Sequence, residues 1–246
     1  MKLALATLWI LAGGAIIGGL YWGFLITPVS TVIALIASAV LAIVTLAVAG
    51  LVANGTIEIW LRGFSVSGLR RALGSVASVV PAALIVLVLW WMTSRAELFV
   101  KENSGQINAW FIARFGWDNV AWLFTSIRYA ATWLRWVLGA MLALSLMAGI
   151  LAAGWGAVAA PAWIARALRP RALLFATLWF AALIVLPWIY LVPWRPEGLP
   201  ATSIEMVFIV AKLSVSAMLA AAGLALIAHE ASRVPAPGRP VAAPSK

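Results

Sequence analysis

The chain lacks cysteine altogether and has a single histidine, His229, among its 246 residues. Without thiolates it cannot build a disulfide framework or an iron–sulfur cluster. One histidine cannot supply a bis-histidine haem site, a three-histidine zinc site or an HExxH helix. Carboxylates are scarce as well, and no close pair of them lies inside an apolar run. We therefore expect no resident cofactor or metal, and no catalytic set of the hydrolytic or two-metal kind.

Charge of either sign is rare, whereas apolar residues are abundant. Only 10% of the residues are charged and 65% are hydrophobic, and the mean hydropathy is +1.07. A soluble domain has roughly 25% charged and about 45–50% apolar residues, so this chain needs lipid as its solvent. Its formal charge of +10 comes from cations at the ends of apolar runs. That placement indicates membrane topology and contact with anionic lipid, and no nucleic-acid partner.

Long apolar runs divide the chain. A membrane helix needs about 20 mostly apolar residues, and the first run is too long to be a cleavable signal peptide. The pattern predicts an all-α, polytopic membrane protein that forms a single transmembrane domain over residues 1–231, followed by a disordered, proline-rich cytoplasmic tail at 232–246. The expected spans are about 3–26, 29–52, 76–92, 137–160, 172–192 and 204–228.

The cations between the spans predict the orientation. With the N-terminus inside, the inner segments hold ten lysines and arginines and the outer segments six, with Lys212 inside the last span. Cytoplasmic loops carry the excess of positive charge. We therefore expect a multi-pass protein of a bacterial inner (cytoplasmic) membrane, with both termini in the cytoplasm.

The connector Asn54–Ser75 follows the second span and reads NGTIEIWLRGFSVSGLRRALGS. Its apolar side chains follow the spacing of one helical face, and they are Ile57, Trp60, Leu61 and Phe64. Glu58 and Arg62 are spaced as an i,i+4 ion pair on the opposite side. The pattern predicts an amphipathic helix that lies in the membrane interface with its charges in water.

Arginines gather at the inner ends of the spans. The candidate contacts with lipid head groups are Arg62, Arg70, Arg71, Arg166, Arg169 and Arg171. Cations at this depth are attracted to anionic lipids. We therefore expect membrane lipids to be partners of the chain.

Aromatic residues fill the long outer segment 93–136, between the third and fourth spans. Its candidate interface residues are Trp110, Trp117, Trp122, Trp133 and Trp136. Asp118 is a plausible N-cap, and no proline or glycine follows it until after Leu138. The segment is thus a long loop or a helix that runs into the fourth span. Tryptophan favours the head-group layer, but an aromatic surface also suits docking of another subunit.

Lys212 lies about eight residues into the last span, and Glu205 lies seven residues before it on the same face. An ionisable side chain inside a membrane indicates a functional site by default. The other interpretation is that the lysine stem runs along the helix and its ammonium reaches the outer interface, or pairs with a neighbour such as Glu205.

The connector also resembles a known family. The matching residues are Gly55, Trp60-Leu61-Arg62-Gly63, Val66 and Gly68-Leu69-Arg70-Arg71-Ala72-Leu73, followed by a span that contains proline. Over roughly residues 30–95, this pattern resembles a bacterial six-helix membrane family that includes the membrane domain joined to some glycerophosphodiester phosphodiesterases. The catalytic domain of those enzymes is missing here. The resemblance implies a six-helix fold and no catalysis.

Three functions are compatible with these features. The first is a non-catalytic membrane subunit, a scaffold, assembly or accessory component that binds other membrane subunits. The second is a transporter or channel component with Lys212 near its pathway. The third, a membrane enzyme that acts on lipid, lacks a base, a metal site and a nucleophile set.

Overall fold

The structure is a computed structural model, and it describes residues 1–27, 31–117, 120–194 and 203–233, with the side chains of 203 and 204 left out. Within these ranges the chain is helical and has no strand. Six helices are long and apolar enough to cross a membrane, and they span Lys2–Ile26, Val32–Arg62, Val76–Glu102, Ala121–Ala153, Pro170–Leu191 and Glu205–Ser232. The prediction of a multi-pass helical membrane protein is confirmed at this level.

The first half of the chain forms two long helices and a short one. Helices α1 (Lys2–Ile26) and α2 (Val32–Arg62) make an antiparallel pair. Thr31 caps the start of α2, and its hydroxyl accepts from the amide of Ala34 at 3.2 Å. Gly63, with φ +89°, ends α2 and turns the chain into α3 (Val66–Gly74). A 3-10 turn, η1 (Val76–Ser78), then leads into α4 (Val79–Glu102).

The second half includes three π-helical segments. Helix α5 (Ser104–Phe115) follows α4, and α6 (Ala121–Trp133) runs through the π-helical η2 (Leu134–Leu138) into α7 (Gly139–Ala153). A 3-10 turn, η3 (Trp155–Val158), and α8 (Ala162–Ala167) connect α7 to α9 (Pro170–Phe180). Helix α9 continues through η4 (Ala181–Val185) and η5 (Pro187–Leu191), and α10 (Ser203–Ser232) completes the fold.

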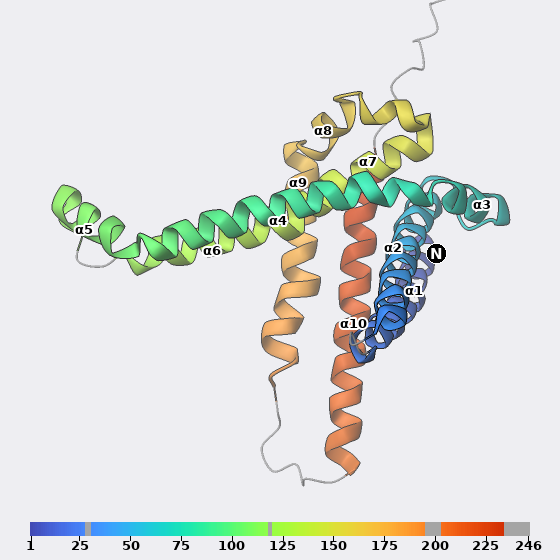
Figure 1. The fold of residues 1–246 in the computed structure, drawn as a ribbon, viewed down its shortest axis with the longest axis horizontal. Helices are drawn as coiled ribbons and strands as arrows, with labels where there is room; N and C mark the ends of the chain where they lie inside the picture. The colour runs from blue at the N-terminus through green and yellow to red at the C-terminus, as the bar shows by residue number, and fades with distance from the viewer. Residues whose placement is uncertain (28–30, 118–119, 195–202, 234–246) are drawn as a thin grey trace, which may run out of the picture.

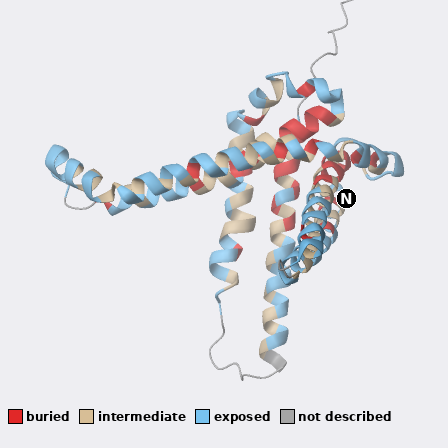
Figure 2. Ribbon diagram, in the orientation of Figure 1, coloured by how far each residue is buried: buried red, intermediate tan, exposed pale blue. Residues whose placement is uncertain are grey.

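The helices leave a common junction in different directions. The paired helices α4 and α6 run to one side, whereas α9 and α10 run downwards and α1 and α2 form a third pair (Figure 1). Buried residues concentrate at the junction, in α7, the end of α2 and the end of α10, as Figure 2 shows in red. The core clusters there join Val137, Met141 and Ile227, and separately Ile57, Ala82 and Ala148.

The predicted span ends differ most from the observed ones in the second, third and fourth spans. The second span continues ten residues further, to Arg62, and the third continues to Glu102. The fourth was predicted over 137–160, but its helix begins at Ala121 and ends at Ala153. Gly154 has φ +76°, which stops the helix before Trp155. The segment 154–160 is therefore a 3-10 turn and loop, although its composition is apolar.

The prediction of a separate interfacial helix containing Ile57, Trp60, Leu61 and Phe64 is wrong in its placement. Residues 54–62 are the last turns of α2, and Phe64 lies beyond that helix. Ile57 and Glu58 are both buried at the junction, so the charge of Glu58 is not in water as predicted. The short helix at this place is α3, which begins after Gly63.

The described part of the outer segment 93–136 is mostly helical, with breaks at Asn103 and between Phe115 and Ala121. Helix α4 extends to its charged end at Glu102, α5 follows, and α6 runs without interruption into α7. This agrees with the expected helix that enters the fourth span. The predicted N-cap Asp118 and the tail beyond residue 233 lie outside the described residues.

Candidate functional site

The most polar part of the junction is centred on the end of α2. Asn54 is fully buried there, and its amide Nδ2 donates to the backbone carbonyls of Ser75 at 2.9 Å and Ala72 at 3.4 Å. The hydroxyl of Ser78 lies 3.1 Å from Nδ2 and 3.3 Å from Oδ1. A buried amide is stable only when its donors and acceptor are satisfied. Asn54 thus ties α2 to the end of α3 and to η1.

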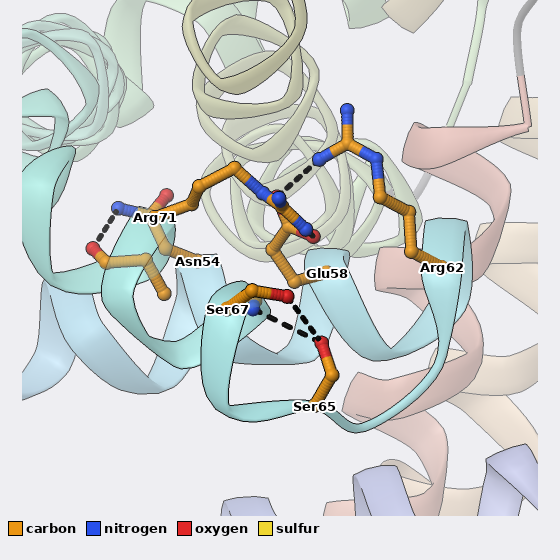
Figure 3. A network of polar contacts seen from close by, with 8 residues as sticks. Asn54, Glu58, Arg62, Ser65, Ser67 and Arg71 are labelled. Carbon is orange, nitrogen blue, oxygen red and sulfur yellow. Dashed lines mark hydrogen bonds and ion pairs between the residues drawn. The ribbon is translucent and has the colours of Figure 1, made fainter.

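Glu58 lies one turn further along α2 and holds two arginines (Figure 3). Its Oε1 accepts from Arg62 Nη1 at 2.8 Å and from Arg71 Nε at 3.2 Å, and its Oε2 accepts from Arg71 Nη2 at 3.3 Å. The carboxylate is only 3% exposed, whereas the side chains of Arg62 and Arg71 are 47% and 43% exposed. The buried charge is therefore neutralised from the surface, and α3 is held against α2 by that attraction.

The turn between α2 and α3 fits around this carboxylate. The Ser65 hydroxyl caps α3 by accepting from the amide of Gly68 at 3.0 Å. A Cβ on Gly68 would lie 3.1 Å from that hydroxyl and 3.6 Å from Glu58 Oε2. A side chain at this position would therefore crowd the Ser65 hydroxyl, whereas its distance from the carboxylate is that of an ordinary van der Waals contact.

A small crevice borders Glu58, between α1, α2 and α3. It is lined by Trp9, Gly55, Glu58, Phe64 and Gly68 among others, and its volume of about 10 Å³ has room for one water at most. Trp9 is held beside it, because its Nε1 donates to the carbonyl of Val52 at 3.0 Å. This crevice is therefore too small for a small-molecule ligand, which needs a pocket of roughly 300–1,000 Å³.

A second set of contacts joins α1, α2 and α10. Lys2 Nζ donates to the carbonyl of Trp60 at 2.9 Å, and Trp60 Nε1 donates to the carbonyl of Ala225 at 2.8 Å. The rings of Trp60 and His229 lie 4.1 Å apart. The expected helix-end position of His229 is correct, but its contact with Trp60 was not predicted, because the two residues are far apart in the sequence.

Lys212 has a structural partner inside the fold. Its Nζ donates to the backbone carbonyls of Val192 at 2.6 Å and Trp194 at 3.1 Å, just after η5. Its ammonium also lies 5.5 Å from the ring centroid of Phe208. The last carbonyls of a helix lack intrahelical donors, and unsatisfied carbonyls are costly in lipid. Lys212 supplies donors there, and Glu205 lies in the first turn of α10.

Replacing Lys212 by Met is expected to loosen the end of the fifth span. The substitution keeps most of the side-chain volume but removes donors to two carbonyls, and we expect a loss of about 1–3 kcal/mol of stability. The measurement is thermal unfolding in a mild detergent, with Lys212→Arg as the variant that keeps the donors. Flux into liposomes tests the transport hypothesis: loss of solute flux in Lys212→Met at unchanged stability would contradict a capping role alone.

The five predicted interface tryptophans fall into two groups. Trp110, Trp117 and Trp122 gather with Phe111 and Phe115 where α5 meets α6, with ring centroids 4.9–5.7 Å apart. Helix α5, which carries part of this aromatic cluster, lies at the far end of the α4–α6 arm (Figure 1).

The other two tryptophans belong to contacts between helices. Trp133 Nε1 donates to the hydroxyl of Thr177 in α9 at 2.8 Å. The ring of Trp136 meets that of Trp90 in α4 edge to face, with centroids 5.9 Å apart. The structure therefore does not bring the five tryptophans together on one surface.

Arg135 makes polar contacts that were not predicted from the sequence. Its side chain is 13% exposed, and it bonds to Thr93, Ser94 and Glu97 of α4 while its guanidinium lies 5.0 Å from the Trp90 ring centroid. Thr93 and Glu97 are four residues apart, so they share a face of α4. That spacing, opposite an arginine on the next helix, is the signal that could have revealed this contact.

The arginines predicted to contact lipid are placed at the junction end of the helices. Arg62 and Arg71 belong to the Glu58 network, and Arg70 is exposed on α3. The other three, Arg166, Arg169 and Arg171, lie at the corner between α8 and α9. Burial, and then the neighbouring charge of Arg169, lower the pKa of Arg166 from its ordinary value.

Within the described ranges, no group of three His, Asp or Glu side chains is close enough to hold a metal ion. Comparison with protein families, with curated proteins and with solved structures finds no match. The resemblance of residues 30–95 to the six-helix family thus stays a prediction.

Proposed function

We propose that this chain is a non-catalytic integral-membrane subunit, a scaffold or assembly component of a larger membrane complex. The observation that carries the proposal is the uncovered apolar surface of its arms. In the most apolar part of the α6–α7 span, 56% of the residues are buried, whereas the corresponding share in the other five spans is 11–17%. The helices are held together at the junction and offer most of their length to other molecules.

A surface of small residues on α1 supports the proposal that the chain binds a protein partner as well as lipid. Gly14 and Gly18 of α1 form a GxxxG pair, and neither has an atom within 4 Å of the place where a Cβ would be. Small residues at this spacing let membrane helices approach one another closely. The described part of the chain does not use this face itself.

The chain's lack of cysteine makes this proposal testable with single-cysteine variants. A photo-reactive benzophenone maleimide on Leu213→Cys in α10 or Leu87→Cys in α4, both at exposed positions, would be activated in native membranes. We expect a covalent adduct between the chain and a partner protein, with a mass greater than that of the chain alone. Ala15→Cys, beside the GxxxG pair, tests in the same way whether a partner contacts α1. If every variant runs at the mass of the free chain and the chain purifies alone in mild detergent, the proposal is wrong.

The orientation of the subunit is a separate prediction. We infer that the junction end faces the cytoplasm of a bacterial inner membrane, because most of the arginines at span ends are located there. Ser67→Cys in α3 should react with a membrane-impermeant maleimide only after the cells are opened. Gln106→Cys in α5, at the far end of the α4–α6 arm, should react in spheroplasts whose inner membrane is still sealed. Both residues are exposed, and the reverse labelling pattern would contradict the orientation.

A further inference from the structure

The connector between α7 and α9 holds a concentration of positive charge without a counter-charge. Arg166 lies in α8, Arg169 immediately precedes α9, and Arg171 lies in its first turn. Within the described residues, no carboxylate pairs with any of the three. Arg62 and Arg71 differ from them in this respect, because Glu58 neutralises part of their charge. The six arginines predicted to contact lipid are therefore not equivalent.

Most N–H donors of these three arginines make no hydrogen bond to the described residues. Arg166 Nε donates to the carbonyl of Ala162 in its own helix at 3.1 Å, and a Cβ on Gly149 of α7 would lie 3.8 Å from Arg166 Nη2. Arg171 lies over the ring of Phe175, 5.8 Å from its centroid. A guanidinium has five donors and stays charged under all physiological conditions. Arg166 and Arg169 therefore repel each other, and the positive end of the α9 dipole adds to the unfavourable concentration of charge.

Apolar side chains surround the same corner. Trp155, Val158, Ile164 and Leu168 are between 39% and 54% exposed, and the corner lies where two apolar helices of membrane-spanning length end. A nucleic acid or an acidic peptide would neutralise the arginines but leave these side chains in water. A phospholipid offers an anionic phosphate and acyl chains together.

We propose that the corner formed by Arg166, Arg169 and Arg171 is a binding site for the phosphate of an anionic phospholipid, whose acyl chains cover the adjoining apolar side chains. The inference does not depend on the identity of a protein partner. It requires only that α7 and α9 cross the membrane. The α8–α9 corner lies at the junction end (Figure 1), so the lipid would occupy the leaflet on that side.

The test is native mass spectrometry of the full chain in neutral detergent, titrated with phosphatidylglycerol or with phosphatidylcholine of the same acyl chains. The wild-type chain should retain phosphatidylglycerol preferentially. Each arginine near a membrane surface contributes about a fivefold preference, so Arg166→Gln/Arg169→Gln/Arg171→Gln should reduce the preference on the order of 10- to 100-fold. The corresponding Arg→Lys variant should keep a substantial part of it, because it conserves the charge.

A matched control removes the same charge elsewhere. Lys101, Arg114 and Arg128 are exposed on α4, α5 and α6, and their triple replacement by Gln should leave the preference unchanged. If both triple variants lose it equally, or if neither does, the assigned site is wrong. Competition by millimolar inorganic phosphate or by a short single-stranded oligonucleotide would also overturn the assignment to lipid. If the triple variant does not fold, Arg169→Gln/Arg171→Gln at two exposed positions serves instead.

Discussion

Replacing both Arg62 and Arg71 by Met, with Glu58 kept, is expected to destabilise the protein by about 3–5 kcal/mol, because it leaves a buried carboxylate without a counter-charge. Glu58 is 3% exposed, and these two arginines are its ion-pair partners. Both arginines are about half exposed, so each pair alone resembles a surface pair, and single replacements should cost about 1 kcal/mol. The combined loss should therefore exceed the sum of the single losses. Thermal unfolding in detergent, followed by tryptophan fluorescence, measures the difference.

Two further variants separate charge from packing in this network. Adding Glu58→Gln to the double variant removes the buried charge and should restore most of the lost stability, since a neutral amide is far cheaper to bury. Arg70→Met changes an exposed arginine next to Arg71 that pairs with no described carboxylate, so it should change little. If the double variant is no less stable than Arg70→Met, or if Glu58→Gln gives no recovery, Glu58 does not hold α3 in the way the geometry indicates.

The ion pair within α2 could be predicted from the sequence, whereas the network around it could not. Glu58 and Arg62 are four residues apart, and that spacing alone predicts their contact. Arg71 reaches the same carboxylate because Gly63 turns the chain with φ +89° into α3, the helix that carries Arg71. A sequence shows that a glycine is present, but not which backbone angles it takes. The burial of Glu58 was missed for the same reason.

Hydropathy located the centres of the spans better than their ends. Its windows stop at polar residues, so α2 was predicted to end near residue 52. The helix continues because Asn54 and Glu58 find partners inside the protein. The opposite error occurred after α7, where apolar residues continue to Pro161 but Gly154 interrupts the helix. The backbone conformation of Gly154 determines where α7 ends, and hydropathy gives no information about backbone conformation.

The arrangement of the arms lay beyond prediction for a different reason. An apolar run indicates that a helix enters lipid, but it carries no information about the angle between two such helices. The contacts that set these directions are single polar pairs between distant segments, such as Trp133 with Thr177 and Arg135 with Thr93. Each member alone looks like an ordinary interfacial residue.

Replacing Gly55 by Ala is expected to separate α1 from α2 at the junction. A Cβ there would lie 2.6 Å from Trp9 Nε1 and 2.7 and 2.8 Å from two carbon atoms of its ring. The indole cannot simply rotate away, because Nε1 is bonded to the carbonyl of Val52. Overpacking typically costs about 1–3 kcal/mol, and loss of the indole hydrogen bond adds about 1 kcal/mol. The melting temperature in detergent should fall.

Gly19→Ala is the matched control, because it makes the same chemical change in a helix where nothing lies within 4 Å of the new Cβ. Alanine stabilises a helix interior by roughly 0.5–1 kcal/mol relative to glycine, so Gly19→Ala should be neutral or stabilising. Trp9→Phe added to Gly55→Ala should recover part of the loss, since the smaller ring gives the methyl group room. Equal stability of Gly55→Ala and Gly19→Ala would show that Trp9 does not press against α2. In that case α1 would not pack tightly against α2 at the junction.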